Sequence, residues 1–131
     1  MLETVAEWLA YADENKVVAD TLLSSPILYK RPYRIICYHA QQQAELYLKA
    51  LYIHCSGGKI PKKTHNLVEL FMEIEEYISV PDGLKQVAGK LSSYAIETRY
   101  PSGEELGEVD AKYAISGADK ISDWVKSITK D

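Results

Sequence analysis

Two sets of side chains, far apart along the chain, have the chemistry to bind a phosphate or a nucleotide. His65 follows Thr64 where a helix is expected to begin, and Arg99 and Tyr100 come directly after a later helical stretch. The N–H groups and the dipole at the start of a helix attract anions. An arginine can bind phosphate through two parallel hydrogen bonds, and a tyrosine ring can stack on a base. These residue types therefore indicate a nucleotide- or RNA-binding site, provided that folding brings them together.

The same residues also have simpler interpretations, and the sequence leaves both open. A histidine beside a helix cap, preceded by Lys62 and Lys63, is commonly part of a solvated basic loop. An arginine at the end of a helix is favoured there by the helix dipole, and a tyrosine can pack over the end of a bundle. The placement of the elements that carry these residues decides between the interpretations.

A polar stripe runs along the stretch 33–56, which is expected to form one long helix. At about 100° of rotation per residue, six polar side chains share one narrow face: Arg34, Tyr38, Gln42, Glu45, Lys49 and Tyr52. A broad apolar face lies on the other side, formed by Ile36, Cys37, Ala40, Ala44, Tyr47, Leu48, Leu51 and Cys55. A helix that is apolar on more than one side belongs in the middle of a bundle or of a dimer.

The polar stripe has two interpretations. It can be a solvated face, in which Glu45 and Lys49 form an i,i+4 ion pair that contributes only ~0.3–0.5 kcal/mol. It can instead be covered by a second subunit or a ligand, with hydrogen bonds formed across the contact. We assign Lys49, together with His65, Arg99 and Tyr100, to the candidate ligand site. The remaining candidates, for a homodimer surface, are Tyr38, Gln42 and Glu45.

Arg34 and His39 have an R-x4-H spacing, which makes a metal-independent ribonuclease an alternative. Five residues apart on one helix, the two side chains point about 140° away from each other. Catalysis needs both on one phosphate, so within one chain the pair is more typical of a flanking arginine and a partly buried histidine. The alternative therefore requires the two residues to meet across a dimer.

Metal and cofactor chemistry finds little support in the sequence. Cys37 and Cys55 are separated by 18 residues of one expected helix, or ~27 Å, which excludes a disulfide between them. No Cys/His spacing typical of zinc is present, and there is no glycine-rich phosphate loop or serine-hydrolase elbow. We expect no metal and no cofactor, and the sequence identifies no catalytic residue.

Composition and charge are those of an ordinary globular domain. The chain has 131 residues, 47% of them hydrophobic, and a net charge of −4, so we expect one domain over residues 1–131. No overall basic field attracts nucleic acid. The chain contains no run of about 18 apolar residues, the length that a membrane-spanning helix needs. Its acidic, amphipathic start is unlike a signal peptide. A cytoplasmic location is the expectation.

Five helical segments are expected, because apolar residues recur at helical spacing between clear breaks. The segments cover residues 2–24, 33–56, 65–78, 84–98 and 109–128, with Gly57 and Gly58 ending the second and Thr64 capping the third. The predicted fold is an all-α, antiparallel up-down bundle of four to five helices. In strict alternation, loops 57–64 and 99–108 share one end, which would bring His65 near Arg99 and Tyr100. Loops 25–32 and 79–83 would share the other end.

Four segments resemble, in order and spacing, motifs of the HEPN-domain family (higher eukaryotes and prokaryotes nucleotide-binding). Residues 40–51, AQQQAELYLKAL, resemble the family's AxQAAExALKALL helix, and residues 61–67, PKKTHNL, resemble its PKTHxL segment. Residues 94–101, YAIETRYP, resemble its Y-x-x-E-x-RYP ending of the fourth helix. Trp8, Ala12 and Asp13 resemble its first-helix pattern. The resemblance covers nearly the whole chain.

This resemblance implies a helical bundle that is often a homodimer and is often encoded beside a minimal nucleotidyltransferase, in toxin–antitoxin-like or stress systems. Ribonuclease members carry R-x4–6-H late in the chain, whereas here no histidine follows Arg99. The resemblance therefore implies the RYP branch, with nucleotide or RNA binding or partnership with the transferase. A dimeric ribonuclease toxin and a structural oligomerisation domain are the alternatives.

Overall fold

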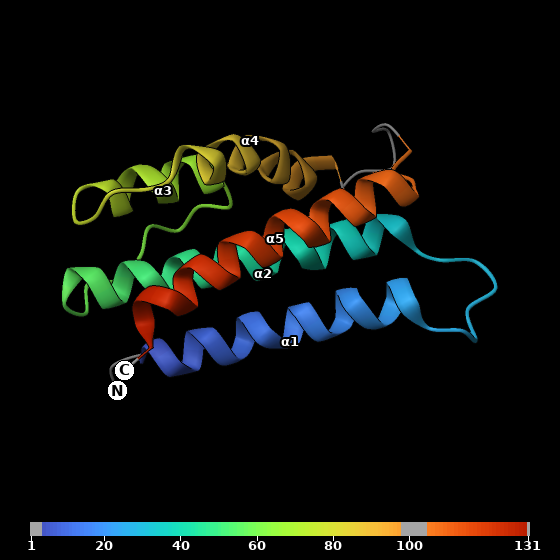
Figure 1. Ribbon diagram of the computed structural model, residues 1–131, viewed down its shortest axis with the longest axis horizontal. Helices are drawn as coiled ribbons and strands as arrows, with labels where there is room; N and C mark the ends of the chain where they lie inside the picture. Colours follow the sequence, from blue (N-terminus) through green and yellow to red (C-terminus); the bar gives the residue numbers. More distant parts are fainter. Residues whose placement is uncertain (1–3, 98–104, 131) are drawn as a thin grey trace.

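The computed structural model describes residues 4–97 and 105–130 (Figure 1). Over these residues the chain forms five α-helices and no strand, which confirms the predicted all-α bundle. The helices are α1 (Val5–Ser24), α2 (Tyr33–Ser56), α3 (Leu67–Glu75), α4 (Asp82–Glu97) and α5 (Glu108–Thr129). The bounds of α2 are those predicted, and α4 and α5 begin and end within about two residues of their predicted limits, which is ordinary scatter for helix ends.

Local sequence explains where the first two helices begin and end. The Thr4 hydroxyl accepts a hydrogen bond from the Glu7 N–H at 3.1 Å, while the Glu7 carboxylate accepts one from the Thr4 N–H at 3.2 Å. This reciprocal capping box satisfies two N–H groups that α1 would otherwise leave unpaired. Gly57 ends α2 with φ of 73°, a left-handed conformation that glycine adopts without the clash a side chain would cause.

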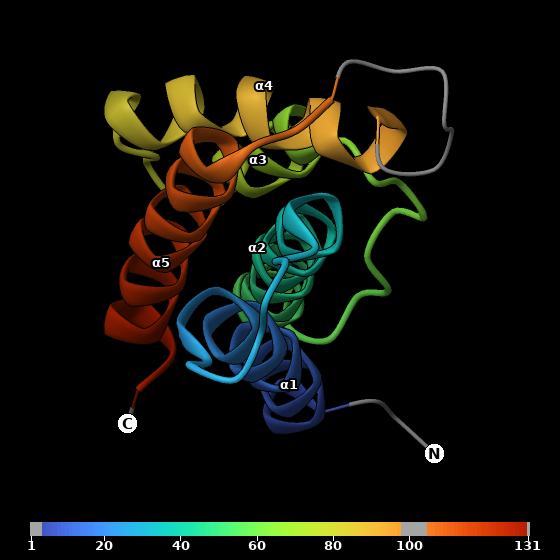
Figure 2. The same ribbon diagram turned by 90° about the vertical axis from the view of Figure 1, so that its right-hand side faces the viewer.

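Helix α2 lies at the centre of the bundle and contacts each of the other four helices. Figure 2, which looks along α2, shows α1 on one side of it, α5 on another, and α3 with α4 across a third. Its apolar face is buried except at Cys55, which is partly exposed, and Ile36, Leu48 and Leu51 are fully buried. Burial of each such side chain contributes about 1.5–3 kcal/mol, so α2 supplies much of the core.

The strict up-down alternation predicted for the bundle is wrong at α3, which runs in the same direction as α2 (Figure 1). His65, just before α3, contacts Glu45 in the middle of α2, whereas Tyr77, just after α3, stacks edge-on against Tyr52 near the end of α2. The ten residues of segment 57–66 can extend ~33 Å. That exceeds the ~17 Å that α2 rises between Glu45 and its end, so the segment can return along α2 before α3 begins.

The reversal of α3 changes which loops lie together. The turn between α3 and α4 lies at the C-terminal end of α2, where the Lys59 ammonium donates to the Tyr77 hydroxyl at 3.2 Å. The 25–32 connection lies at the opposite end, as does the start of α5 (Figure 1). The predicted pairing of 25–32 with 79–83 is therefore not formed, and most of loop 99–108, expected beside 57–64, lies outside the described residues.

The predicted cap of α3 is also wrong. Asn66 caps the helix, because its side-chain oxygen accepts from the N–H groups of Val68 and Glu69 at 2.9 and 3.4 Å. The Thr64 hydroxyl accepts instead from the Asn66 N–H at 3.1 Å, a local turn that competes with capping. Helix α3 accordingly begins two residues later than predicted, at Leu67.

None of the helices in the described part of the chain is long and apolar enough to cross a membrane.

Candidate functional site

The carboxylate of Glu45 is the centre of a buried polar cluster between α2 and segment 57–66. Its side chain is only 4% exposed. It accepts hydrogen bonds from the Lys49 ammonium at 3.0 Å, from His65 Nδ1 at 2.9 Å and from Gln41 Nε2 at 3.3 Å. A buried carboxylate needs such compensation. We call this group the Glu45 cluster (Gln41, Glu45, Lys49 and His65).

The orientation of each partner in the Glu45 cluster follows from its hydrogen bonds. A carboxylate only accepts, so His65 Nδ1 carries a proton, and in the neutral ring Nε2 is left as an acceptor. Gln41 Nε2 also donates to the His65 carbonyl at 3.0 Å, which fixes the amide because its oxygen could not face two acceptors. Among the described residues, no donor reaches the buried Oε1 of Gln41.

His65 is the exposed member of the Glu45 cluster, with half of its side chain accessible. It belongs to no helix and is held against α2 by the contacts of its ring and of its carbonyl. The structure therefore presents to solvent an imidazole whose position is fixed by a buried carboxylate.

The polar stripe of α2 is covered over part of its length by the same chain. Segment 57–66 covers Glu45 and Lys49, and Tyr77 covers Tyr52. The interpretation as a wholly solvated face is thus wrong, and this half of the stripe needs no second subunit to bury it. Further towards the start of α2, Gln42 Nε2 donates to the Tyr38 hydroxyl at 3.3 Å, and both side chains are half-buried. A homodimer contact there stays a prediction.

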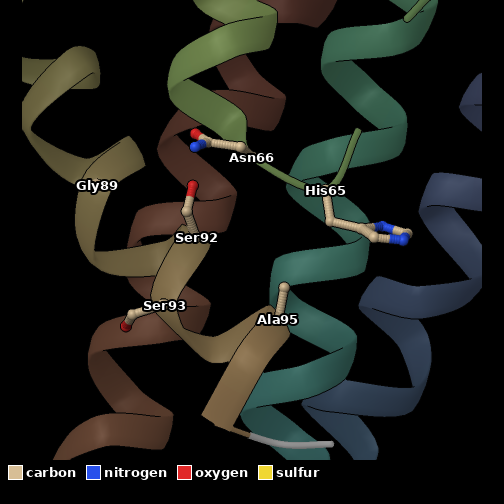
Figure 3. A pocket seen from close by; sticks show the side chains of 6 residues that line it. All are labelled: His65, Asn66, Gly89, Ser92, Ser93 and Ala95. Carbon is tan, nitrogen blue, oxygen red and sulfur yellow. The ribbon is translucent and has the colours of Figure 1, made fainter. Parts of the chain in front are cut away.

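A pocket of about 220 Å³ opens beside His65, between the start of α3 and the last turns of α4. Its lining residues are His65, Asn66, Gly89, Ser92, Ser93 and Ala95 (Figure 3). Ser92 and Asn66 point towards each other across it, whereas the imidazole of His65 points away, towards α2 (Figure 3). The lining is therefore mostly apolar with a few hydroxyl and amide groups, and the imidazole stands at its rim.

The N-terminus of α3 does not offer free N–H groups to a phosphate. The Leu67 N–H donates to the Ser92 hydroxyl at 2.8 Å, and the next two N–H groups are capped by Asn66. A helix N-terminus binds anions through unpaired N–H groups. The phosphate contact expected there from the sequence is therefore not favoured, and the polar side chains of the pocket are the better candidates.

Of the four residues assigned to the ligand site, the structure brings two together. Lys49 and His65 both contact Glu45, while Arg99 and Tyr100 lie outside the described residues. Lys49 is buried against Glu45 and neutralises it, so its charge is not presented to solvent. The pocket reaches Ala95, four residues before Arg99 in the sequence.

Comparison with known proteins identifies the family. The HEPN domain family matches residues 5–128, nearly the entire chain. The chain belongs to the HEPN domain family. It is also similar to a solved structure, TT1696 from Thermus thermophilus, with 29% sequence identity and a TM-score of 0.79, over 94% of this chain and 96% of that one. Comparison with curated proteins finds no match.

Arg34 and His39 of this HEPN domain are not brought together within one chain. His39 lies against α1, where its Nδ1 is 2.8 Å from Asn15 Oδ1, and burial lowers the pKa of its imidazole. Arg34 is exposed on the first turn of α2, and the helix rotation between the two is about 140°. The partly buried histidine expected from the sequence is what the structure shows, and nothing within one chain favours the ribonuclease interpretation.

A second polar cluster, between α1, α2 and α5, did not stand out in the sequence. Buried Gln43 donates to Asp119 at 3.1 Å and to the Ser122 hydroxyl at 2.8 Å, and Lys16 bridges Asp20 and Asp119 at 2.9 and 3.0 Å. These contacts tie α5 to α2 and α1. The sequence signal that could have pointed to this cluster was Gln43, a glutamine among apolar residues on a face of the central helix.

In the described part of the chain, no group of three or more His, Cys, Asp or Glu side chains could hold a metal ion.

Proposed function

We propose that this HEPN domain binds a nucleotide or RNA at the surface where segment 57–66 meets the end of α4. The observation that carries the proposal is the fixed position of His65. A buried carboxylate orients its ring at 2.9 Å, and a pocket whose mostly apolar lining includes Asn66 and Ser93 opens beside it. Half-exposed side chains held so firmly by buried partners are typical of binding sites.

The groups present match the phosphate and sugar parts of a nucleotide better than the base. His65 Nε2 can accept from a ribose hydroxyl or, when protonated, donate to a phosphate oxygen. The side-chain amide of Asn66 supplies a further donor in the pocket, and the Ser93 hydroxyl, which donates to the Lys90 carbonyl at 2.7 Å, can still accept. At about 220 Å³ the pocket is smaller than the ~300–1,000 Å³ of complete ligand sites. Arg99 and Tyr100 are proposed to complete it, with the arginine on a phosphate and the tyrosine under a base.

Lys49 has a different role in this proposal from the one inferred from the sequence. It balances the charge of Glu45, and through Glu45 it helps to hold His65, so it is a positioning residue. The proposal assigns direct ligand contact to His65, Arg99 and Tyr100.

The biological setting is proposed from the family resemblance. We infer a homodimeric partner of a minimal nucleotidyltransferase in a toxin–antitoxin-like or stress system, located in the cytoplasm. The half-buried Tyr38 and Gln42 are the proposed dimer contact, because they bind each other and lie beyond the part of the stripe that segment 57–66 covers.

Calorimetric titration with a panel of mononucleotides tests the binding proposal. His65→Ala and Arg99→Ala are each expected to weaken binding about tenfold, the loss of one charge-assisted hydrogen bond. His54→Ala is the matched control, because His54 is exposed on α2 but makes no part of the Glu45 cluster. If the wild type binds neither a nucleotide nor a co-expressed transferase, the proposal fails and a structural oligomerisation domain is the remaining interpretation.

A further inference from the structure

The hydrogen-bond donors of the Glu45 cluster are directed at the protein itself. The Lys49 ammonium and the His65 Nδ1–H donate to the Glu45 carboxylate at 3.0 and 2.9 Å. The Gln41 amide donates to the same carboxylate at 3.3 Å and to the His65 carbonyl at 3.0 Å. Lys49 is also buried, so the cluster does not present its cation to a ligand.

The serines of the adjoining pocket also donate to the protein. The Ser92 hydroxyl donates to the Ala88 carbonyl at 2.7 Å. The Ser93 hydroxyl donates to the Lys90 carbonyl, also at 2.7 Å, and keeps lone pairs that can accept. The side-chain amide of Asn66 is the donor that remains, and no lysine or arginine is among the described residues that line the pocket.

Two acceptors of the Glu45 cluster have no donor in the described part of the chain. One is the Oε1 of Gln41, which is buried. The other is the Nε2 of His65, on a side chain that is half exposed. Glu45 keeps Nε2 as an acceptor, because it holds the proton of the neutral ring on Nδ1. The surroundings of His65 are therefore short of donors, and the ligand group that complements Nε2 is one that donates.

The parts of a nucleotide differ in what they can offer to His65 Nε2. An ionised phosphate oxygen only accepts, so it would meet the lone pair of a neutral imidazole with no proton between them, whereas a ribose hydroxyl can donate. The charge of the cluster also favours an uncharged group. Lys49 balances Glu45 at 3.0 Å, so with a neutral ring the cluster has no net charge with which to attract a phosphate.

We propose that His65 Nε2 accepts a hydrogen bond from a ribose hydroxyl, so that the site selects ribonucleotides over nucleotides whose sugar has no hydroxyl. This inference rests on the proposed nucleotide-binding function and gives His65 the role of a specificity-determining residue, positioned by Glu45. A site that bonds a hydroxyl discriminates against the analogue lacking it, because its acceptor is then left unpaired. Since His65 is half exposed, water can replace the hydroxyl, and the expected discrimination is about tenfold, far below the ~10⁴ of buried sites.

Calorimetric titration with uridine 5′-monophosphate and its 2′,3′-dideoxy analogue tests the inference, in mildly alkaline buffer so that the imidazole is uncharged. Uracil has no exocyclic amine, so a difference between the two nucleotides reports on the sugar hydroxyls. The wild type is expected to bind the ribonucleotide about tenfold more tightly, and the two single deoxy forms identify the hydroxyl. His65→Ala is expected to bind both nucleotides with equal affinity. A purely structural role of His65 would instead weaken both nucleotides alike and leave their ratio unchanged.

A second exposed histidine provides the matched control. His54 lies on α2 outside the Glu45 cluster, so His54→Ala is expected to keep the wild-type ratio between the two nucleotides. If the wild type binds both nucleotides equally, or if His65→Ala keeps the wild-type ratio, the inference is overturned while the proposed nucleotide binding stands. If the wild type binds no nucleotide at all, the proposed function fails and this inference fails with it.

Discussion

Breaking the ion pair between Glu45 and Lys49 from one side is expected to destabilise the domain strongly. Both side chains are buried, and their charged atoms are 3.0 Å apart. Removing one partner of a buried pair costs about 3–5 kcal/mol, because the other charge is left uncompensated. In Lys49→Met, His65 and Gln41 remain as donors to the carboxylate. The expected loss of unfolding free energy therefore lies at the lower end of that range, about 3 kcal/mol.

Removing both charges together is expected to cost no more than removing one. Replacing a buried pair by neutral groups of similar size is often nearly neutral, and in Glu45→Gln the new amide oxygen can still accept from His65. A double-mutant cycle with Lys49→Met and Glu45→Gln should therefore give a coupling energy of about 2–3 kcal/mol. Urea unfolding followed by far-ultraviolet circular dichroism measures each free energy, with equal m-values as the check on two-state behaviour.

An exposed ion pair in the same part of the fold provides the matched control. The Lys62 ammonium and the Glu69 carboxylate are 3.8 Å apart, and each side chain is about half exposed. Lys62→Met is expected to change the unfolding free energy by less than about 0.5 kcal/mol, since exposed pairs contribute little. The reasoning is refuted if the two single substitutions at Glu45 and Lys49 add to the double one within about 0.5 kcal/mol.

Three further substitutions test other parts of the fold. Gly117→Ala is expected to cost about 1–3 kcal/mol by overpacking, because the added Cβ would lie 2.7 Å from Val87 Cγ1; the melting temperature should fall. Asn66→Ala is expected to cost about 1 kcal/mol through loss of a helix cap, and Thr64→Ala clearly less, in urea unfolding; the reverse order would contradict the assignment of the cap. Burial lowers the pKa of His39, so the unfolded chain binds that proton first as pH falls below about 6.5. Stability should then decrease between neutral and mildly acidic pH, and His39→Gln should flatten that decrease; an unchanged slope would contradict it.

Sequence alone predicted the helices well because the signals for them are local. Apolar spacing and glycine at positions 57 and 58 fixed both ends of α2, and the breaks around α4 and α5 placed those helices to within a turn. The predicted start of α3 was wrong, because Thr64 was taken as the cap and Asn66 caps instead. Both residue types can cap, and the choice depends on which hydroxyl or amide reaches a helical N–H group.

The site was predicted less well because it depends on how segments pack. The direction of α3 depends on segment 57–66 running back along α2. No local sequence pattern indicates the path that such a connecting segment takes. That course converts Glu45 and Lys49 from surface residues into a buried pair, and it brings His65 to the middle of α2. The sequence analysis assigned both Lys49 and His65 to the ligand site, whereas in the structure both contact Glu45 and Lys49 is buried there.

The central position of α2 has a consequence for the order in which the domain can fold. Helices α1 and α2 are neighbours in sequence, so their interface forms at little loop-closure cost. Gln43 of α2, in contrast, finds its partners Asp119 and Ser122 more than seventy residues later. During synthesis from the N-terminus, a helical hairpin of α1 and α2 can therefore form while one side of α2 has no covering helix. That side carries the Gln43 amide and apolar residues that α5 covers in the folded domain. The nascent chain therefore exposes a surface prone to association with other proteins until α5 is made and packs against it.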